Sequence, residues 1–271
     1  MKPADPSPQN SSNHLSGQTV LVTRAADQSA ALVQRIEAAG GRAIVHPVIE
    51  ILPAANLGAL DAAIQRLDEF ELLVFTSRNG VQFFKDRLDT VKASLPPQIQ
   101  LAAIGSSTAQ LIQELWQIEP AVPKRSHSPS LADFLIDEYL QQKMLLVRGD
   151  RGSDVLDKRL IESDADFESV VAYRSVDVTT ALPSVVEMFE AGQIGWVTAT
   201  SSAIGRSVVN LFGKWLSGDK KKTQSGQAEK RVTKLVSISP TTTAAIESVS
   251  GEVAAEATEY DLNGLIEAMK L

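Results

Sequence analysis

The chain has 271 residues, which is long enough for two domains. Of these residues, 44% are hydrophobic and 22% are charged, a composition typical of globular proteins. Its formal net charge of -7 argues against non-specific binding to nucleic acid. The absence of cysteine excludes disulfides, thiolate-bound metals and a cysteine nucleophile, and the three histidines, His14, His46 and His127, lie too far apart in sequence to predict a metal site.

The N-terminal segment, residues 1–16, is rich in Pro, Ser and Asn and is predicted to be a disordered tail. It has no apolar centre of the kind that a signal peptide needs. No apolar run in the chain approaches the roughly 20 residues that cross a bilayer. We therefore expect a cytoplasmic protein that does not enter a membrane.

Short β-branched runs alternate along the chain with longer segments of helical period. VLVTR (20–24) predicts a strand, residues 29–41 predict a helix that ends at Gly40-Gly41, and RAIVHPVIEI (42–51) predicts a second strand. Further buried strands are predicted at 72–77, 101–106, 144–149, 195–201, 234–239 and 252–257. This alternation indicates an α/β protein with parallel sheets flanked by helices.

The second half of the chain repeats the first. Arg24 ends the strand VLVTR and Arg148 ends MLLVR, and Thr76 and Thr200 follow two strands at the same offset of 124 positions. Later matches, such as Ile104 with Ile238, have an offset of 134. We infer two similar α/β units, with a ligand cleft expected between them.

A hydrophilic segment accounts for the change of offset. Residues 217–231, SGDKKKTQSGQAEKR, lie between the matches that are 124 positions apart and those that are 134 apart. We interpret this segment, including Lys220, Lys221 and Lys222, as a solvated loop rather than as a nucleic-acid site.

Four predicted strand-to-helix turns carry hydroxyl or amide side chains. Ligands collect at the carboxyl ends of parallel strands, where free N–H groups of the following helix can bind an anion. Ser, Thr and Asn are also the usual N-caps of helices, so capping alone explains any single turn. The candidate substrate-binding residues in these turns are Thr76, Ser77, Arg78, Asn79, Gly105, Ser106, Ser107, Thr108, Thr200, Ser201, Ser202, Thr241 and Thr242.

The phosphate-binding loops G-x-x-x-x-G-K-[ST] and G-x-G-x-x-G do not occur in the sequence, which argues against nucleotide chemistry and a dinucleotide cofactor. The histidines do not fall beside the strand-end serines, so no Ser-His-Asp arrangement is predicted.

Seven segments occur in the order, and at about the spacing, found in the uroporphyrinogen-III synthases. They are VLVTR, FTSRNGVQFF, AAIGSSTAQLI, VPKRSHSPSLADFL, LLVRGDRGSDVLDKRL, ESVVAYRSV and SISPTTTAAI. The chain resembles this family over residues 18–271. The resemblance implies two domains joined by a two-stranded linker, HPVIEILP and SVVAYRSVDV. Domain one is expected at 17–49 plus 176–271, and domain two, inserted, at 53–172.

The resemblance also implies a reaction. Members of the family convert hydroxymethylbilane, a linear tetrapyrrole with eight carboxylates, into uroporphyrinogen III, and they invert ring D through a spiro intermediate. The enzyme mainly orients the substrate, so no cofactor and no metal is expected. Tyr173 matches the family's tyrosine that is proposed to help the hydroxyl group leave. The hydroxyl turns and Arg148, with help from Arg24 and Arg151, are expected to hold the carboxylates.

Two other readings stay open at this point. A non-catalytic two-domain protein that binds a small anion also duplicates an α/β unit, and a receiver domain shares the fold class but needs an acidic cluster at its strand ends. We further expect a monomer that acts on a small molecule, with the preceding enzyme of the pathway as a candidate partner and with no nucleic-acid partner.

Overall fold

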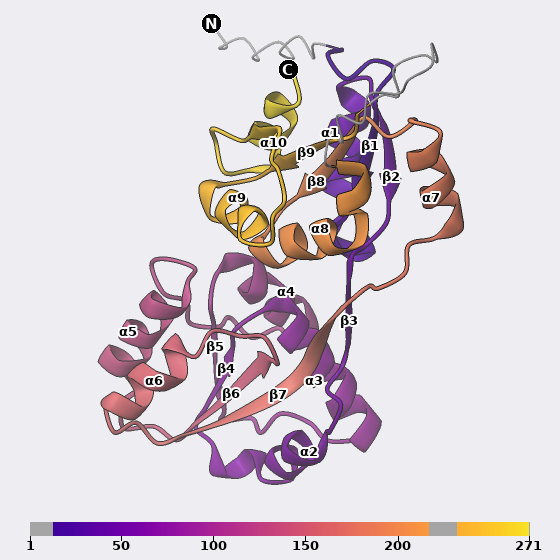
Figure 1. Cartoon of the computed structure of the whole chain (residues 1–271). Helices are drawn as coiled ribbons and strands as arrows, with labels where there is room; N and C mark the ends of the chain where they lie inside the picture. Colours follow the sequence, from indigo (N-terminus) through magenta and orange to yellow (C-terminus); the bar gives the residue numbers. More distant parts are fainter. Residues whose placement is uncertain (1–12, 217–231, 271) are drawn as a thin grey trace, which may run out of the picture. The chain divides into compact units, whose positions relative to one another are not determined.

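The computed structural model describes residues 13–216 and 232–270. The chain divides into two compact units, drawn in Figure 1: unit 1 consists of the residues up to Glu50 and from Asp177 onward, and unit 2 is Ile51–Val176. The chain therefore passes from one unit to the other twice. The predicted loop 217–231 lies outside the described residues.

Each unit contains one five-stranded sheet. The sheet of unit 1 has the order β10-β9-β8-β1-β2, and that of unit 2 has the order β3-β7-β6-β4-β5. The strands of unit 1 are β1 (Thr19–Val22), β2 (Arg42–Val45), β8 (Trp196–Ala199), β9 (Lys234–Ser237) and β10 (Ala255–Glu256). Those of unit 2 are β3 (Ile49–Pro53), β4 (Leu72–Phe75), β5 (Gln100–Ala103), β6 (Met144–Gly149) and β7 (Phe167–Asp177), with β3 and β7 continuing to the unit boundary.

The predicted repeat is confirmed by the pairing of the strands. Val20 of β1 pairs with Trp196 of β8, and Met144 of β6 pairs with Leu72 of β4. Met144 lies 124 positions after Val20, and Trp196 lies 124 positions after Leu72, so the two pairs are equivalent. The pairs of β1 with β2 and of β6 with β7 also share one register. The two sheets are therefore built on one hydrogen-bonding plan.

The boundaries of the sequence repeat do not coincide with the boundaries of the structural units. The first half of the chain supplies β1 and β2 to unit 1 and β4 and β5 to unit 2. The second half supplies β6 and β7 to unit 2 and β8, β9 and β10 to unit 1. Each sheet thus combines strands from both copies of the repeat, which is why each unit needs both halves of the chain to fold.

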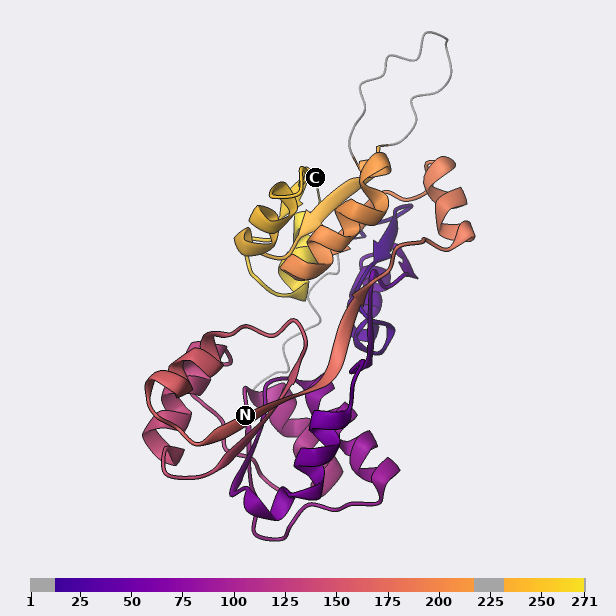
Figure 2. The ribbon, with the colours of Figure 1, turned by 60° about the horizontal axis from the view of Figure 1, so that its bottom comes forward.

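Helices cover both faces of the sheet in unit 2, as Figures 1 and 2 show. One face packs against α2 (Gly58–Gln65), α3 (Arg78–Val91) and α4 (Ser106–Trp116), and the other against α5 (Ser128–Tyr139) and α6 (Val155–Glu162). Side chains of β4 alternate between the faces: Leu73 and Phe75 belong to the first core, and Leu72 and Val74 to the second. This explains why the strands read as continuous apolar runs.

Unit 1 repeats this layering. Helices α7 (Pro183–Glu190), α8 (Ser202–Leu216) and α9 (Pro240–Glu247) pack on one face of its sheet, and α1 (Ala30–Ala38) and α10 (Leu262–Ala268) pack on the other. The predicted helix at 29–41 is thus present, and its Leu32 and Ile36 are fully buried.

Two sequence-based predictions are wrong. The last residues of the predicted tail 1–16 are ordered, because Leu15 is fully buried in the unit 1 core and donates its N–H to the carbonyl of Ala39. The predicted strand 42–51 is two strands, β2 and β3, in different sheets. Pro47 separates them, since it has no N–H to give to a ladder and restricts the residue before it.

His46 is a buried polar residue at the end of β2. It is 5% exposed, its ring lies 5.6 Å from that of Phe212, and its Nε2 has no hydrogen-bond partner. Burial lowers the pKa of the His46 imidazole. The corresponding residue in unit 2 is the apolar Val170, which is 1% exposed.

We expect His46 to make the protein less stable in weak acid. Because its folded pKa is below the unfolded value of about 6.5, the unfolded state binds more protons there, and stability falls as pH drops below about 6.5, by at most about 1.4 kcal/mol per pH unit. His46→Val should remove this slope, as judged by urea unfolding between pH 7.5 and pH 5. An unchanged slope in the variant would show that other groups cause it.

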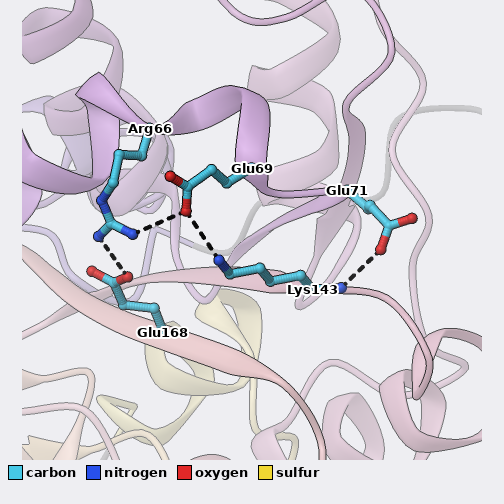
Figure 3. A network of polar contacts seen from close by, with 5 residues as sticks. All are labelled: Arg66, Glu69, Glu71, Lys143 and Glu168. Atoms are coloured by element: carbon cyan, nitrogen blue, oxygen red, sulfur yellow. Dashed lines mark hydrogen bonds and ion pairs between the residues drawn. The ribbon is translucent and has the colours of Figure 1, made fainter.

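The amino edge of the unit 2 sheet carries a network of charges, shown in Figure 3. Arg66 contacts Glu168 at 3.0 Å and Glu69 at 3.3 Å, and Lys143 contacts Glu69 at 3.1 Å. The hydrogen bond from Lys143, with a smaller effect of Arg66, lowers the pKa of Glu69. These charges pair with one another while 34% to 46% of each side chain stays exposed, so this edge offers structural ion pairs of small energetic value.

Candidate active site

The carboxyl edge of the unit 2 sheet holds the candidate catalytic residue, Tyr173, on β7. Its hydroxyl oxygen lies 3.0 Å from the Oγ of Ser77, which follows β4. The ring stacks on that of Phe83, with centroids 5.9 Å apart and planes at 24°. Two predicted site residues that are 96 positions apart are therefore in direct contact, and the phenol is held from two sides.

Gly149, the last residue of β6, lies against the ring of Tyr173. A Cβ atom at this position would lie 2.5 Å from Cζ and 2.7 Å from the hydroxyl oxygen of Tyr173. The strands are irregular here: Arg148 pairs with Val171 while Gly149 pairs with Tyr173, so β7 contains one extra residue. Such bulges redirect side chains at the edges of sheets. The main chain is fixed by the N–H of Asp150, which donates to the carbonyl of Tyr173 at 3.0 Å.

A pocket of about 110 Å³ opens beside these residues in unit 2. Thr76, Arg148, Asp157 and Tyr173 are among the residues that line it. A cavity of roughly 10–15 Å³ already holds one water molecule, so this pocket can take a small polar substituent of a ligand.

The positive charge of Arg148 is compensated inside the protein. Its guanidinium donates to Asp157 at 2.5 Å and lies 3.6 Å from Asp154, and its side chain is only 12% exposed. Arg148 was predicted to bind substrate, and it does line the pocket, but its charge is already matched. A ligand carboxylate would therefore have to compete with two aspartates for this guanidinium.

Helix α3 begins with a side-chain cap and helix α4 does not. Ser77 accepts the N–H of Gly80 at 3.0 Å at the start of α3, whereas Gly105 at the start of α4 has no side chain to offer. Arg78 joins the two turns by donating to the carbonyl of Ser107 at 2.8 Å. The exposed first turn of α4, with Ser106 and Ser107, is the better placed of the two to offer N–H groups to an anion.

The corresponding turns of unit 1 have the same construction. Ser201 accepts the N–H of Ile204 at 3.3 Å, which corresponds by the repeat to the contact between Ser77 and Gly80. Ser202 donates to the carbonyl of Thr241 at 3.2 Å, which corresponds to the contact between Arg78 and Ser107. The repeat therefore extends to the hydrogen bonds of the candidate turns.

Residues 30–267 match the family model described as uroporphyrinogen-III synthase HemD. The chain belongs to the uroporphyrinogen-III synthase family. This membership favours the enzyme over the non-catalytic binding protein and over the receiver domain.

Relatives in the uroporphyrinogen-III synthase family match most of the chain. The uroporphyrinogen-III synthase of Synechococcus elongatus is 28% identical over 258 residues, which cover 94% of this chain and 96% of that protein. The uroporphyrinogen-III synthase of Chlorobaculum parvum is 30% identical over 201 residues, which cover 72% of this chain and 79% of that protein.

Solved structures of the family have the same fold. A mutant uroporphyrinogen III synthase from Thermus thermophilus superimposes with a TM-score of 0.57 at 15% identity, covering 93% of this chain and 97% of that one. The uroporphyrinogen-III synthetase of Helicobacter pylori gives a TM-score of 0.56 at 16% identity, covering 92% and 97%.

Two of the residues expected to bind substrate in this member of the uroporphyrinogen-III synthase family have buried side chains. Thr108 is 3% exposed and Thr242 is 2% exposed. The hydroxyl of Thr242 lies 3.2 Å from that of Ser239, the N-cap of α9. As the third residue of its helix, each turns its side chain inward, so a role of these two positions in substrate binding stays a prediction.

The remaining predicted side chains are partly or fully accessible. Thr76, Asn79, Thr200, Ser201 and Ser202 are partly buried, and Arg78 and Thr241 are exposed. The sequence did not point to Phe83, Gly149 or Asp157, although each touches a predicted site residue. A glycine at the end of the buried strand β6 was a signal for a close approach at that position.

No helix in the described part of the chain is long and apolar enough to cross a membrane. Within residues 13–216 and 232–270, no three His, Asp or Glu side chains are grouped so that they could hold a metal ion.

Proposed function

We propose that this chain is a uroporphyrinogen-III synthase that closes hydroxymethylbilane to uroporphyrinogen III with inversion of ring D. The observation that carries the proposal is the phenol of Tyr173, fixed at the carboxyl edge of the unit 2 sheet beside a pocket. Family membership over residues 30–267 supports the same reaction.

The reaction needs few catalytic groups. Loss of the terminal hydroxyl gives an azafulvene, which the substituted carbon of ring D attacks to form the spiro intermediate. That intermediate then opens and closes again with the ring inverted. A neutral phenol can donate a hydrogen bond to the departing hydroxyl, and a site that holds the chain curled blocks the simpler closure to the uninverted isomer.

The substrate's carboxylates can be bound by hydrogen-bond donors and do not require a basic surface. In unit 2 the exposed first turn of α4 can supply N–H groups, and in unit 1 the exposed residue Thr241 begins the corresponding helix with Pro240. Carboxylate recognition of this kind is compatible with the net charge of -7.

The test is incubation of the protein with freshly generated hydroxymethylbilane, followed by oxidation and separation of the porphyrin isomers. A predominance of the type III isomer is expected. Formation of the type I isomer alone, at the rate seen without protein, would refute the proposal.

We further propose a cytoplasmic monomer that receives its substrate from the preceding enzyme. Sedimentation equilibrium should then give a mass near 29.1 kDa, and a dimer mass would exclude the monomer.

Tyr173→Phe is expected to lower turnover by roughly 10- to 100-fold, because one hydrogen bond to a developing charge is lost. The ring can keep its stacking on Phe83, so the fold should be unchanged. The measurement is the rate of type III isomer formation, with circular dichroism to check the fold. The exposed Tyr260, 65% accessible, gives the matched control Tyr260→Phe, which should keep full turnover. Full turnover in Tyr173→Phe would make Tyr173 a packing residue only.

A further inference from the structure

The hydroxyl of Ser77 connects a helix cap to the candidate acid. Its Oγ accepts the N–H of Gly80 at 3.0 Å and lies 3.0 Å from the hydroxyl oxygen of Tyr173. A serine hydroxyl has one hydrogen to donate and two lone pairs. With one lone pair taken by Gly80, the other lone pair and the hydrogen remain for Tyr173.

The repeat provides an internal comparison for this contact. Ser201 corresponds to Ser77 and caps α8 by accepting the N–H of Ile204 at 3.3 Å. The position that corresponds to Tyr173 is Ile49, which has no hydroxyl. The cap is therefore complete without a phenol, and the bond between Ser77 and Tyr173 is an addition found only in unit 2.

The ring of Tyr173 has little freedom to turn. Phe83 stacks on this ring, and the backbone of Gly149 lies so close to it that a Cβ atom would not fit between Gly149 and the ring. The oxygen is thus fixed, and the remaining variable is the direction of its hydrogen. If Tyr173 donates to Ser77, that hydrogen is not available to a ligand. If Ser77 donates to Tyr173, the phenol hydrogen is free.

We propose that Ser77 is a positioning residue that donates its hydrogen to the Tyr173 oxygen and so directs the phenol hydrogen toward the leaving hydroxyl. The inference rests on the proposed function. The C–O bond of the hydroxymethyl group breaks as the pyrrole nitrogen supplies electrons, and the departing oxygen takes the phenol proton to become water. The phenolate keeps the hydrogen bond from Ser77. It regains a proton from the carbon that loses one when the macrocycle closes.

The variant that tests this is Ser77→Gly. Glycine is a nearly adequate N-cap, and Gly105 already begins α4 in the same unit, so the variant removes the hydroxyl while sparing the helix. Ser201→Gly is the matched control for loss of a capping hydroxyl, because Ser201 caps α8 while Ile49 stands at the position that corresponds to Tyr173. Ser77→Thr keeps both the cap and the donor and serves as the conservative variant.

The first measurement does not depend on activity. In protein labelled with carbon-13 at tyrosine Cζ, the Tyr173 resonance is assigned by its loss in Tyr173→Phe. It should move in Ser77→Gly, return toward its original position in Ser77→Thr, and stay in place in Ser201→Gly. A resonance that is the same in wild type and Ser77→Gly would overturn the proposal.

The second measurement is a double-mutant cycle on the formation of the type III isomer. Ser77→Gly should lower kcat roughly 10-fold with little change in KM, because it acts through Tyr173 on the step that breaks the C–O bond. Ser77→Gly combined with Tyr173→Phe should be no slower than Tyr173→Phe alone. Multiplied losses would show that Ser77 acts independently of Tyr173. Absence of type III isomer with the wild type would refute the proposed function alone, and the resonance test of the contact would still stand.

Discussion

Replacement of Gly149 by alanine is expected to lower turnover at least about 100-fold, which exceeds the loss from Tyr173→Phe. The added Cβ would lie 2.5 Å from Cζ of Tyr173, far inside contact distance. The main chain of Tyr173 is bound to Asp150, so the ring itself has to move. A shift of about 1 Å in a catalytic group costs roughly 100-fold, and the displaced ring also intrudes on the pocket that it lines.

The loss in Gly149→Ala is steric rather than conformational. Gly149 is not among the glycines with positive φ, so alanine fits its backbone, and Ala25 stands at the corresponding position of unit 1. The measurement is kcat for type III isomer formation. In a Tyr173→Ala background, where no ring remains, the same substitution should cause no further loss. Full turnover of Gly149→Ala in the native background would show that the ring has more freedom than these contacts allow.

Phe75→Ala is expected to lower the free energy of unfolding by about 3–5 kcal/mol. Phe75 ends β4, directly before Thr76 and Ser77, and it is fully buried. Its ring meets Phe84 edge-on at 5.5 Å and stacks on Trp116 at 5.8 Å. Removing it leaves a cavity that these rigid rings cannot fill, so the lost contacts add to the lost burial.

Urea unfolding followed by circular dichroism measures this loss. The control is Tyr260→Ala, which removes an aromatic ring that is 65% exposed and should change the free energy of unfolding by less than about 0.5 kcal/mol. A loss below about 1 kcal/mol in Phe75→Ala would mean that the core of unit 2 closes around the missing ring.

The sequence alone determined the fold class and the repeat. Apolar period is a local property, so strands such as β4 and β6 and the helix at α1 could be read directly from it. The offset of 124 positions was visible because both sheets keep one register, as the pairs Val20 with Trp196 and Met144 with Leu72 show. The order of the seven family segments, including the one that contains Tyr173, was likewise present in the sequence.

Only the tertiary structure decided which of these residues meet. The exchange of strands between the halves brings Ser77 to Tyr173 across 96 positions, and no local pattern encodes a contact at that range. Burial of Thr108 depends on which side of α4 faces the core. The charge of Arg148 is compensated by Asp157 because α6 packs beside β6. Local sequence sets the elements, whereas the availability of a charge or a hydroxyl is set by neighbours that the sheet order brings together.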